Sequence, residues 1–480
     1  MVRIVAVLFF ILSVPLAFPK MLLAQPTEVY AGVAQVDITP PVGYAHYRGV
    51  STGVHDPLYA KAVVIGQGDQ RFALVVCDLL WVERDLSAKA RLLASQETQI
   101  PHSNMIIAGT HSHTSPAYHL NIEELNSALR PDTYVAPKSP DGGEYPEWLA
   151  GAIAKAIIDA DKASVRVTLE AGTGTVEDLA YNRRFILNDG TVRFNAGVGN
   201  PAIVRAAGPV DRDFGMILIK RASDSKPIGC VSSFALHADT FGGTEYSADY
   251  PGFLASALSR EFGEDFVSIF GPGACGDINH VNVNAEKGSR RLSSEEIGEK
   301  LALAIKRELP NLKKVENPVL AGEAEFVYAP LQQFSEKELE WALPEVQDSL
   351  YNESAFLTRR RAVKIRSLHR MRQTGEAIPP TIGEGPWIIP LEVQVFKIGN
   401  DVAVVGLPGE VFTELSMAIK EASPFPNTLV IELTNSHIAY VPTKKAFLQG
   451  SYETINSRVA PGGGELMVES AVRLLHDLKE

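Results

Sequence analysis

The sequence predicts a mixed α/β fold in which βαβ-like units surround central sheets. Three passages, 72–114, 228–280 and 402–442, each run from an apolar strand through a polar tip and an amphipathic helix to a second strand and a second polar tip. The 45% apolar and 21% charged residues are typical of a globular protein with a substantial core. The irregular spacing of the passages indicates a weak repeat of supersecondary units and not a solenoid. Because sites in α/β folds assemble beyond strand ends, we expect one site where these tips meet.

The first 24 residues are predicted to be a signal peptide. Arg3 supplies a positive n-region, Val5 to Phe18 form a short apolar run, and Ala24 is a small residue at the expected cleavage point. The run ends at Pro19, short of the ~20 residues that a membrane-spanning helix needs. We therefore expect a secreted or periplasmic protein with one domain over 25–480.

The charge and the cysteine content indicate which partners and cross-links to expect. The net charge of −12 argues against nucleic acid as a partner, because phosphate binding needs clustered Lys and Arg. One basic cluster, 359–370, lies in a helical pattern with acidic neighbours, and we expect it to be a solvated helix face. The three cysteines, Cys77, Cys230 and Cys275, lie in or beside apolar strands and are expected to be buried free thiols.

The elements follow in order along the chain. Strands are expected at 31–37, 58–65, 72–77, 105–109, 165–172, 216–220, 228–236, 266–270, 391–398, 402–406 and 429–433. Helices are expected near 86–94, 147–162, 250–262 and 411–421. Two more helices are expected to begin at capping boxes, one at Ser293 with Glu296 and one at Ser335 with Glu338. The second helix is expected to run to about residue 372, with a break at Pro344. The polar loop 118–145 is long enough to be a lid.

The first candidate site follows the strand at 105–109. Gly109-Thr-His111-Ser-His113-Thr-Ser-Pro116 places two histidines one residue apart. Residues at i and i+2 of an extended chain point the same way, so both imidazoles can address one site. This pattern indicates a metal or proton-transfer pair, although a His-x-His in a polar loop can also be incidental.

Further ionisable residues stand at the other strand ends. Zinc binds histidine nitrogen and carboxylate oxygen, and catalytic zinc keeps an open position for water. Histidines from two tips and Glu410 from a third would form such a set, with Tyr440 as a fourth ligand or an acid. Each has a structural alternative: Glu410 could stabilise a helix N-terminus by ~0.3–1 kcal/mol, and Asp277 is expected to hold a tight turn. The tips carry Asp78, His111, His113, His237, Asp239, Asp277, His280, Glu410, His437 and Tyr440.

The run from Gly109 to Pro116 resembles the Gly-Thr-His-Thr-His-Ser-Gly-Pro signature of the neutral, non-lysosomal ceramidases. The resemblance continues in the same order over most of the chain. Its further elements are Ala31 to Pro41, Asn182-Arg183, Leu236-His237, Gly276-Asp277, Pro408-Gly-Glu410, Tyr440-Val-Pro-Thr443 and Tyr452-Glu453.

The resemblance implies a bound Zn²⁺ and assigns roles to individual residues. The implied zinc ligands are His111, His237, Glu410 and Tyr440, and the implied catalytic residues are His113, Arg183, Tyr440 and Tyr452. We expect His113 to act as general base and then acid, and Tyr440, Tyr452 or Arg183 to steady the oxyanion. Asp239 is expected to support a ligand histidine. A short form is also implied, without the C-terminal β-domain of the long enzymes.

The chain also departs from the family pattern. Thr114-Ser-Pro-Ala117 replaces Ser-Gly-Pro-Gly-Gly, Arg184 replaces the serine after Asn-Arg, and the loop after the histidines is polar and acidic. We expect a zinc amidohydrolase that cleaves the N-acyl amide of ceramide or a related N-acyl lipid to a fatty acid and an amine. One alternative is a zinc hydrolase of the same fold acting on a polar amide, ester or lactone, such as a carbohydrate derivative. Another is a non-catalytic exported binding protein.

The expected partner is a small-molecule or lipid N-acyl substrate. Transient contact with a membrane surface would accompany a lipid substrate, and no partner protein is implied.

Overall fold

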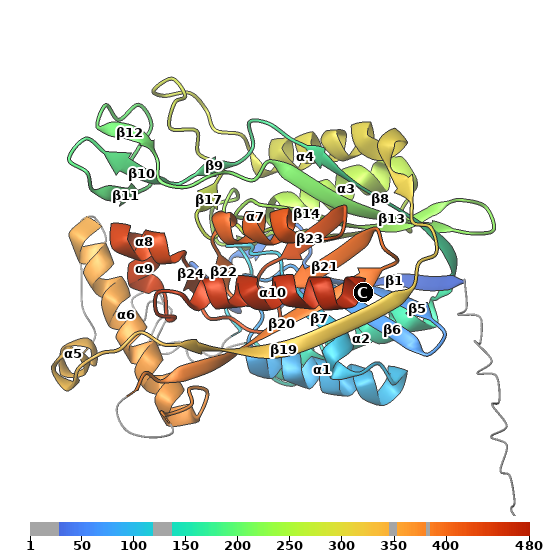
Figure 1. Cartoon of the computed structure of the whole chain (residues 1–480), viewed down its shortest axis with the longest axis horizontal. Helices are drawn as coiled ribbons and strands as arrows, with labels where there is room; N and C mark the ends of the chain where they lie inside the picture. The colour runs from blue at the N-terminus through green and yellow to red at the C-terminus, as the bar shows by residue number, and fades with distance from the viewer. Residues whose placement is uncertain (1–27, 119–136, 345–352, 381–384) are drawn as a thin grey trace, which may run out of the picture.

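The computed structural model describes residues 28–118, 137–344, 353–380 and 385–480. The expected signal peptide lies outside these residues, and so does most of the expected lid at 118–145. Of that loop, the described residues 137–144 lead into helix α2 (Tyr145–Lys162), which matches the helix predicted at 147–162. The structure confirms the mixed α/β fold, with several sheets and helices packed on them (Figure 1).

A large sheet runs through the middle of the molecule. Its order is β16-β14-β13-β8-β1-β5-β6-β7, and β18 also pairs with β8. Its inner pairs are antiparallel, whereas β6 with β7 at one edge and β14 with β16 at the other are parallel. Parallel neighbours need a crossover connection, and α1 (Arg84–Thr98) and α3 (Asp249–Phe262) supply the two helices. The strands are β1 (Val29–Asp37), β5 (Tyr59–Gln67), β6 (Gln70–Cys77), β7 (Met105–Gly109), β8 (Val165–Thr175), β13 (Asp213–Arg221), β14 (Pro227–Phe234), β16 (Val267–Pro272) and β18 (Lys313–Lys314).

A smaller sheet contains the third βαβ unit. Its order is β19 (Leu320–Pro330), β20 (Ile388–Ile398), β21 (Val402–Gly406) and β23 (Asn427–Ile431). The first two pairings are antiparallel, and β21 pairs with β23 in parallel through α7 (Thr413–Ala422). All three strand-helix-strand passages predicted from the sequence are therefore parallel units.

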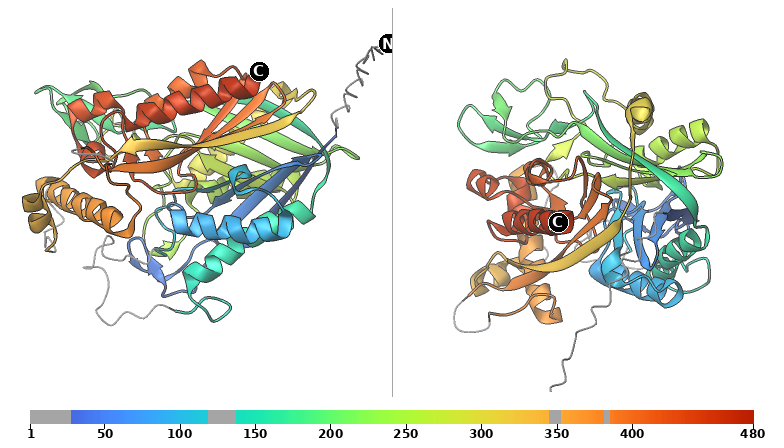
Figure 2. Two further views of the ribbon diagram at one scale, coloured as in Figure 1. Left: turned by 60° about the horizontal axis from the view of Figure 1, so that its bottom comes forward. Right: turned by 45° about the vertical axis from the view of Figure 1, so that its right-hand side comes forward.

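The two sheets pack face to face, and helices cover their outer faces. Val63, Ile106 and Ile217 of the large sheet pack with Phe396 and Val404 of the small sheet in one buried cluster. On the large sheet, α1 and α2 cover one half, while α3 and α4 (Ser294–Glu308) cover the other. Helices α7 and α10 (Gly463–Lys479) cover the small sheet, so the layers run helix, sheet, sheet, helix (Figure 2).

Shorter ladders lie at the strand ends. Each pairs residues distant in sequence or closes a hairpin beside the main sheets. They are β2 (Ala45–His46) with β3 (Gly49–Val50), β4 (Gly53–Val54) with β15 (Glu245–Tyr246), β9 (Tyr181–Asn182) with β17 (Ile278–Asn279), β22 (Glu410–Val411) with β24 (Tyr440–Val441), and β10 (Arg184–Leu187) between β11 (Val192–Phe194) and β12 (Ile203–Ala206).

Both predicted capping boxes form. The Ser293 hydroxyl accepts from the Glu296 amide at the start of α4, and Ser335 does the same with Glu338 at α5 (Glu336–Ala342). Short helices η1 (His102–Asn104), η4 (Leu309–Asn311), α8 (Lys444–Gln449) and α9 (Tyr452–Asn456) complete the described helices. The three cysteines are buried and free, as predicted. None of the described helices is both long and apolar enough to span a membrane.

The prediction for the basic cluster was wrong. These residues lie on α6 (Glu353–Thr374), which packs against α5 and α9. Of its basic residues between 359 and 370, Arg361 is exposed and the others are at least half-buried. Ala362 and Ile365 on the same helix pack against Ala342. Most of the basic side chains are therefore partly buried, because α6 packs between α5 and α9.

Candidate metal centre

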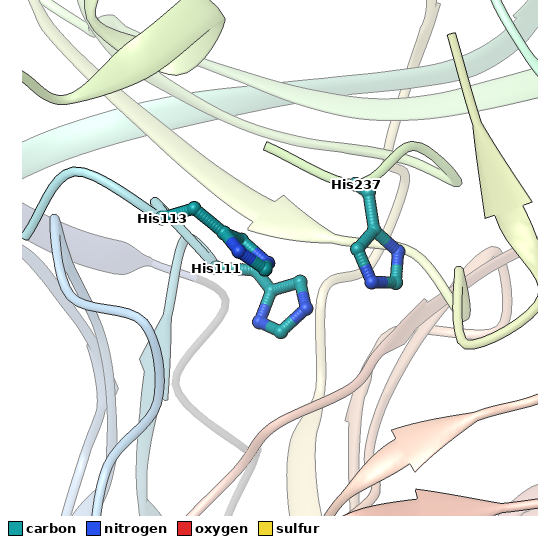
Figure 3. Close-up of side chains that lie close together, drawn as sticks. All are labelled: His111, His113 and His237. Atoms are coloured by element: carbon teal, nitrogen blue, oxygen red, sulfur yellow. The ribbon is translucent and has the colours of Figure 1, made fainter. Parts of the chain in front are cut away.

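Strand ends from both sheets meet at one place. His111 follows β7 and His237 follows β14, both in the large sheet. Glu410 and Tyr440 follow β21 and β23 of the small sheet. The rings of His111, His113 and His237 face a common space from two sides (Figure 3). The convergence expected from the sequence therefore occurs between the sheets.

Backbone carbonyls fix the two histidines. His111 Nδ1 lies 2.9 Å from the Leu80 carbonyl oxygen, and His237 Nδ1 lies 2.7 Å from that of Cys275. A carbonyl oxygen can only accept a hydrogen bond, so Nδ1 carries the proton in each ring. The lone pair of each Nε2 is thereby directed into the shared space, as a metal ligand requires.

Glu410 completes a donor set with metal-like spacing. Its Oε2 lies 3.4 Å from His111 Nε2 and 3.5 Å from His237 Nε2. A tetrahedral zinc with bonds of about 2.0–2.1 Å holds its ligand atoms about 3.3–3.4 Å apart. His111 Nε2 and Glu410 Oε2 are also buried without a hydrogen-bond partner among the described residues. Such atoms are rarely left unsatisfied in proteins, and a cation between them satisfies both.

His113 belongs to the same cluster. One ring nitrogen from each of His111, His113 and His237 lies within 4.8 Å of the others, so the buried cluster could hold a metal ion. The Nε2 of His113 is buried without a partner among the described residues, while its Nδ1 lies 3.8 Å from Asp239 Oδ1. His113 thus stands beside the metal position, either as a further nitrogen donor or as a proton-transfer group.

The backbone at His111 differs from the expected extended strand. Strand β7 ends at Gly109, and His111 adopts a left-handed conformation with φ of 68°. The His111 and His113 rings are 5.0 Å apart at 81°. Both rings therefore face the site, as predicted, but the predicted reason was wrong. A turn, and not an extended strand, directs them there.

Glu410 and Tyr440 are direct neighbours on a short parallel ladder. The register of β22 and β24 pairs Glu410 with Tyr440. Gly409 precedes Glu410 with φ of 82°, and a Cβ there would lie 2.6 Å from the Ile438 side chain. A Cβ on Gly276 would lie 2.5 Å from the Glu410 carbonyl oxygen. The glycines of both motifs thus let three chain segments close around the carboxylate.

A buried ionic network holds Arg183 against the site. Arg183 Nε lies 3.0 Å from Glu453 Oε1, and Arg184 Nη1 lies 2.7 Å from Glu453 Oε2. Arg183 Nη2 donates to the Gly276 carbonyl at 2.7 Å, and Arg183 Nη1 lies 3.0 Å from His237 Nε2, whose lone pair a bound metal would take. Glu453 therefore orients the guanidinium that faces the metal-binding nitrogen of His237.

Burial and mutual charge set the protonation states. Burial alone would raise the pKa of Glu410, but the charge of His111 holds it well below its usual range. Burial lowers the pKa of His237, and Arg183 lowers it further. Burial and the neighbouring His111 lower the pKa of His113 well below its usual value. Burial alone would lower the pKa of His111, but the charge of Glu410 raises it above its usual value. Because a metal binds an ionised carboxylate and neutral imidazoles, a metal ion bound here would displace that proton from His111.

Comparison with known proteins identifies the family. Residues 30–290, more than half of the chain, match the model of the neutral/alkaline non-lysosomal ceramidase N-terminal domain. The chain belongs to this family. A neutral ceramidase of Drosophila melanogaster is 25% identical over 270 residues, which span 52% of this chain and 35% of that relative. The match thus covers only about a third of the relative's length.

Solved ceramidase structures share the fold. The neutral ceramidase of Pseudomonas aeruginosa matches with a TM-score of 0.68 and 16% identity, over 95% of this chain and 75% of that chain. A structure described as ceramidase complexed with C2 gives the same TM-score and identity over 95% of this chain and 76% of that chain. The fold match therefore extends beyond residue 290, to the segments that carry Glu410 and Tyr440.

The other predicted residues of this ceramidase-family site fall into place around the donors. Tyr440 and Tyr452 line the adjoining cavity, with ring centroids 5.4 Å apart. Asp239 does not support a ligand histidine, because carbonyls hold both Nδ1 atoms; it lies beside His113 and pairs with Arg48. Asp277 is structural as predicted, since it accepts from the Asn182 side chain and the Thr413 amide.

Three neighbours of the site had no role assigned from the sequence. His437 Nε2 lies 3.8 Å from Glu410 Oε1, and its ring stacks on Trp81 at 3.9 Å. Tyr47 meets His113 edge-on at 5.2 Å. Of these three residues, only His437 could be recognised from the sequence, because it is an ionisable residue that follows a predicted strand. Trp81 and Tyr47 lie in loops where nothing in the pattern marks them.

Proposed function

We propose that the protein is a secreted or periplasmic zinc-dependent amidohydrolase that cleaves the N-acyl amide of ceramide or a related N-acyl lipid. One observation supports it most strongly: Glu410 Oε2 stands at metal-ligand spacing from two buried imidazole nitrogens in a chain of the ceramidase family. The products are a fatty acid and an amine. The intact donor set weighs against a non-catalytic binding protein.

The residues that would hold the zinc are His111, His237, Glu410 and Tyr440. The first three present the spacing described above, and Tyr440 is paired with Glu410 in register. A zinc ion there supplies Lewis acidity, which activates water at neutral pH and polarises the amide carbonyl.

The proton transfers belong to His113. Its neutral form can take a proton from the attacking water, whose oxygen adds to the amide carbon, and return that proton to the amine nitrogen as the C–N bond breaks. Arg183, Tyr440 and Tyr452 are the donors proposed for the developing oxyanion, because all three lie at the same end of the site.

A lipid substrate implies approach from a membrane surface. One of the matching solved structures is a ceramidase complexed with C2, and this ligand-bound relative supports a lipid substrate for a chain of the same fold. We propose transient surface contact here, with no partner protein required.

A second candidate is hydrolysis of a polar amide, ester or lactone at the same centre. The cavity beside the donors is only about 90 Å³, below the ~300–1,000 Å³ typical of ligand pockets. Its lining includes Arg370 and Arg458 among several aromatic rings. A small, charged cavity favours a polar group next to the scissile bond.

The test is to purify the chain, measure its zinc content and assay a fluorogenic ceramide with and without a chelator. We expect bound zinc and chelator-sensitive release of fatty acid. Full zinc occupancy with no ceramide turnover would exclude ceramide as the substrate and favour hydrolysis of a polar amide, ester or lactone. A protein without bound metal whose activity ignores the chelator would contradict both.

A further inference from the structure

Glu432 lies where the two sheets meet, behind the metal centre. It directly follows β23 of the small sheet, and its amide donates to the Pro272 carbonyl at the end of β16 in the large sheet at 3.0 Å. Its side chain is fully buried and is not among the residues that line the metal-site cavity. Glu432 is therefore out of reach of a substrate in that cavity.

The carboxyl group of Glu432 joins two chain segments. Its Oε2 accepts from the Val411 amide at 2.6 Å, and its Oε1 lies 2.9 Å from the Cys275 thiol. Burial raises the pKa of Glu432 to about 8, so the group carries its proton at neutral pH. Because the Val411 amide donates to Oε2, this proton belongs on Oε1, beside the sulfur. An apolar side chain would fill the same space but would leave a buried amide without an acceptor.

Each of the two segments carries a proposed zinc ligand. Val411 directly follows Glu410 in the chain. The Cys275 carbonyl fixes the His237 ring, because His237 Nδ1 lies 2.7 Å from its oxygen. The distance of 3.5 Å between Glu410 Oε2 and His237 Nε2 therefore depends on how these segments are held together. Glu432 holds both of them through one side chain.

We propose that Glu432 is a positioning residue of the metal centre, which sets the distance between the Glu410 carboxylate and the His237 imidazole. The inference rests on the proposed function as far as the metal centre, and it does not depend on which substrate is cleaved. Hydrogen bonds that orient metal ligands typically change metal affinity by about 10–100-fold. Loss of the Glu432 carboxyl group should therefore weaken zinc binding although every ligand remains in place.

Two substitutions of similar length test this role. Glu432→Gln keeps an oxygen that can accept from the Val411 amide, whereas Glu432→Met fills the same space without one. We expect the zinc Kd of the full chain, measured by competition with a fluorescent chelator, to rise by about 10–100-fold in Glu432→Met. Glu432→Gln should recover most of the wild-type affinity. If Glu432→Met does not fold, Glu432→Asp replaces it, and its shorter side chain should also weaken zinc binding because it cannot reach both segments.

Gln67→Met is the matched control. Gln67 Oε1 accepts from the Leu320 amide at 3.1 Å in buried surroundings, so this substitution also leaves a buried amide without an acceptor. Gln67 pairs with Gln70 at the start of β6, whereas the histidine turn follows the strand paired with the end of β6. Gln67→Met should lower stability in urea but leave the zinc Kd unchanged. An equal zinc Kd in Glu432→Met and Gln67→Met would overturn the proposal.

Cobalt binding reports the geometry of the ligands. Co²⁺ can take the place of zinc, and its visible absorption depends on how its ligands are arranged around it. At saturating Co²⁺, we expect a changed spectrum in Glu432→Met and the wild-type spectrum in Glu432→Gln and Gln67→Met. Identical spectra in Glu432→Met and wild type would overturn the positioning role.

These measurements also separate the positioning role from the substrate assignment. If Glu432→Met changes zinc affinity and the cobalt spectrum as expected but wild type does not cleave a fluorogenic ceramide, only the assigned substrate fails. If wild type binds neither zinc nor cobalt, the metal centre and the role of Glu432 both fail.

Discussion

Glu453 is predicted to be the most sensitive ionic residue of the site. Its side chain is fully buried between Arg183 and Arg184, whose side chains are 6% and 1% exposed. In Glu453→Gln one oxygen still accepts, but the amide NH₂ faces a guanidinium donor, and two buried cations lose their counter-charge. Breaking a buried pair from one side costs about 3–5 kcal/mol. We expect a loss at the low end of that range, about 3 kcal/mol of the free energy of unfolding, because Gln preserves one acceptor.

Urea unfolding followed by circular dichroism measures this loss. The matched control is Glu316→Gln, because Glu316 pairs with Lys314 at 3.3 Å where the side chains are 70% and 56% exposed. An exposed pair contributes about 0–1 kcal/mol. A loss in Glu453→Gln no larger than in the control would refute the argument that Glu453 carries this network. The variant should also lose rate, since Arg183 is no longer held beside His237.

Three further outcomes follow from particular contacts. Gly276→Ala should weaken zinc binding and lower stability by about 1–3 kcal/mol, because its Cβ would meet the Glu410 carbonyl oxygen at 2.5 Å. Gly151→Ala, inside α2 with nothing within 4 Å, should leave zinc binding unchanged and should not lower stability. Burial, with help from Arg458, lowers the pKa of Lys364 to about 8. The unfolded state therefore binds more protons between pH 8 and about 10.5, and stability should rise across that window by up to about 3 kcal/mol. Urea titrations at both ends should show a flatter profile in Lys364→Met, and an identical profile would contradict the assignment. His113→Asn should keep zinc and lose about 10²–10⁴ in rate, whereas loss of zinc would make His113 a ligand.

Much of the architecture was predictable because it depends on local pattern. Apolar runs followed by amphipathic helices define the three parallel units, and their order forces polar tips toward a common end. His111, His237 and Glu410 could be placed near one another on that basis, and the resemblance separated ligands from catalytic residues. The capping serines were predictable for the same reason, since their partners lie three residues away.

Long-range packing explains what the sequence could not show. Glu453 meets Arg183 across 270 residues, and no periodicity links them. The left-handed turn at His111 is imposed by contacts with the Leu79 and Leu80 carbonyls. The basic residues of α6 were predicted to form a solvated face because they lie in a helical pattern with acidic neighbours. Which of them turn inward depends on the packing of α6 against α5 and α9.

The metal content of the purified protein tests the central claim most directly. Wild type, Glu410→Ala and Glu414→Ala should be dialysed against trace zinc and analysed by mass spectrometry of the metal. Glu414 is a suitable control because it lies nearby in the first turn of α7, with its side chain 44% exposed. We expect about one zinc per chain in wild type and in Glu414→Ala, and little in Glu410→Ala, because the remaining histidines lose their shared carboxylate. Equal zinc in all three proteins, or none in wild type, would contradict a metal centre built on His111, His237 and Glu410.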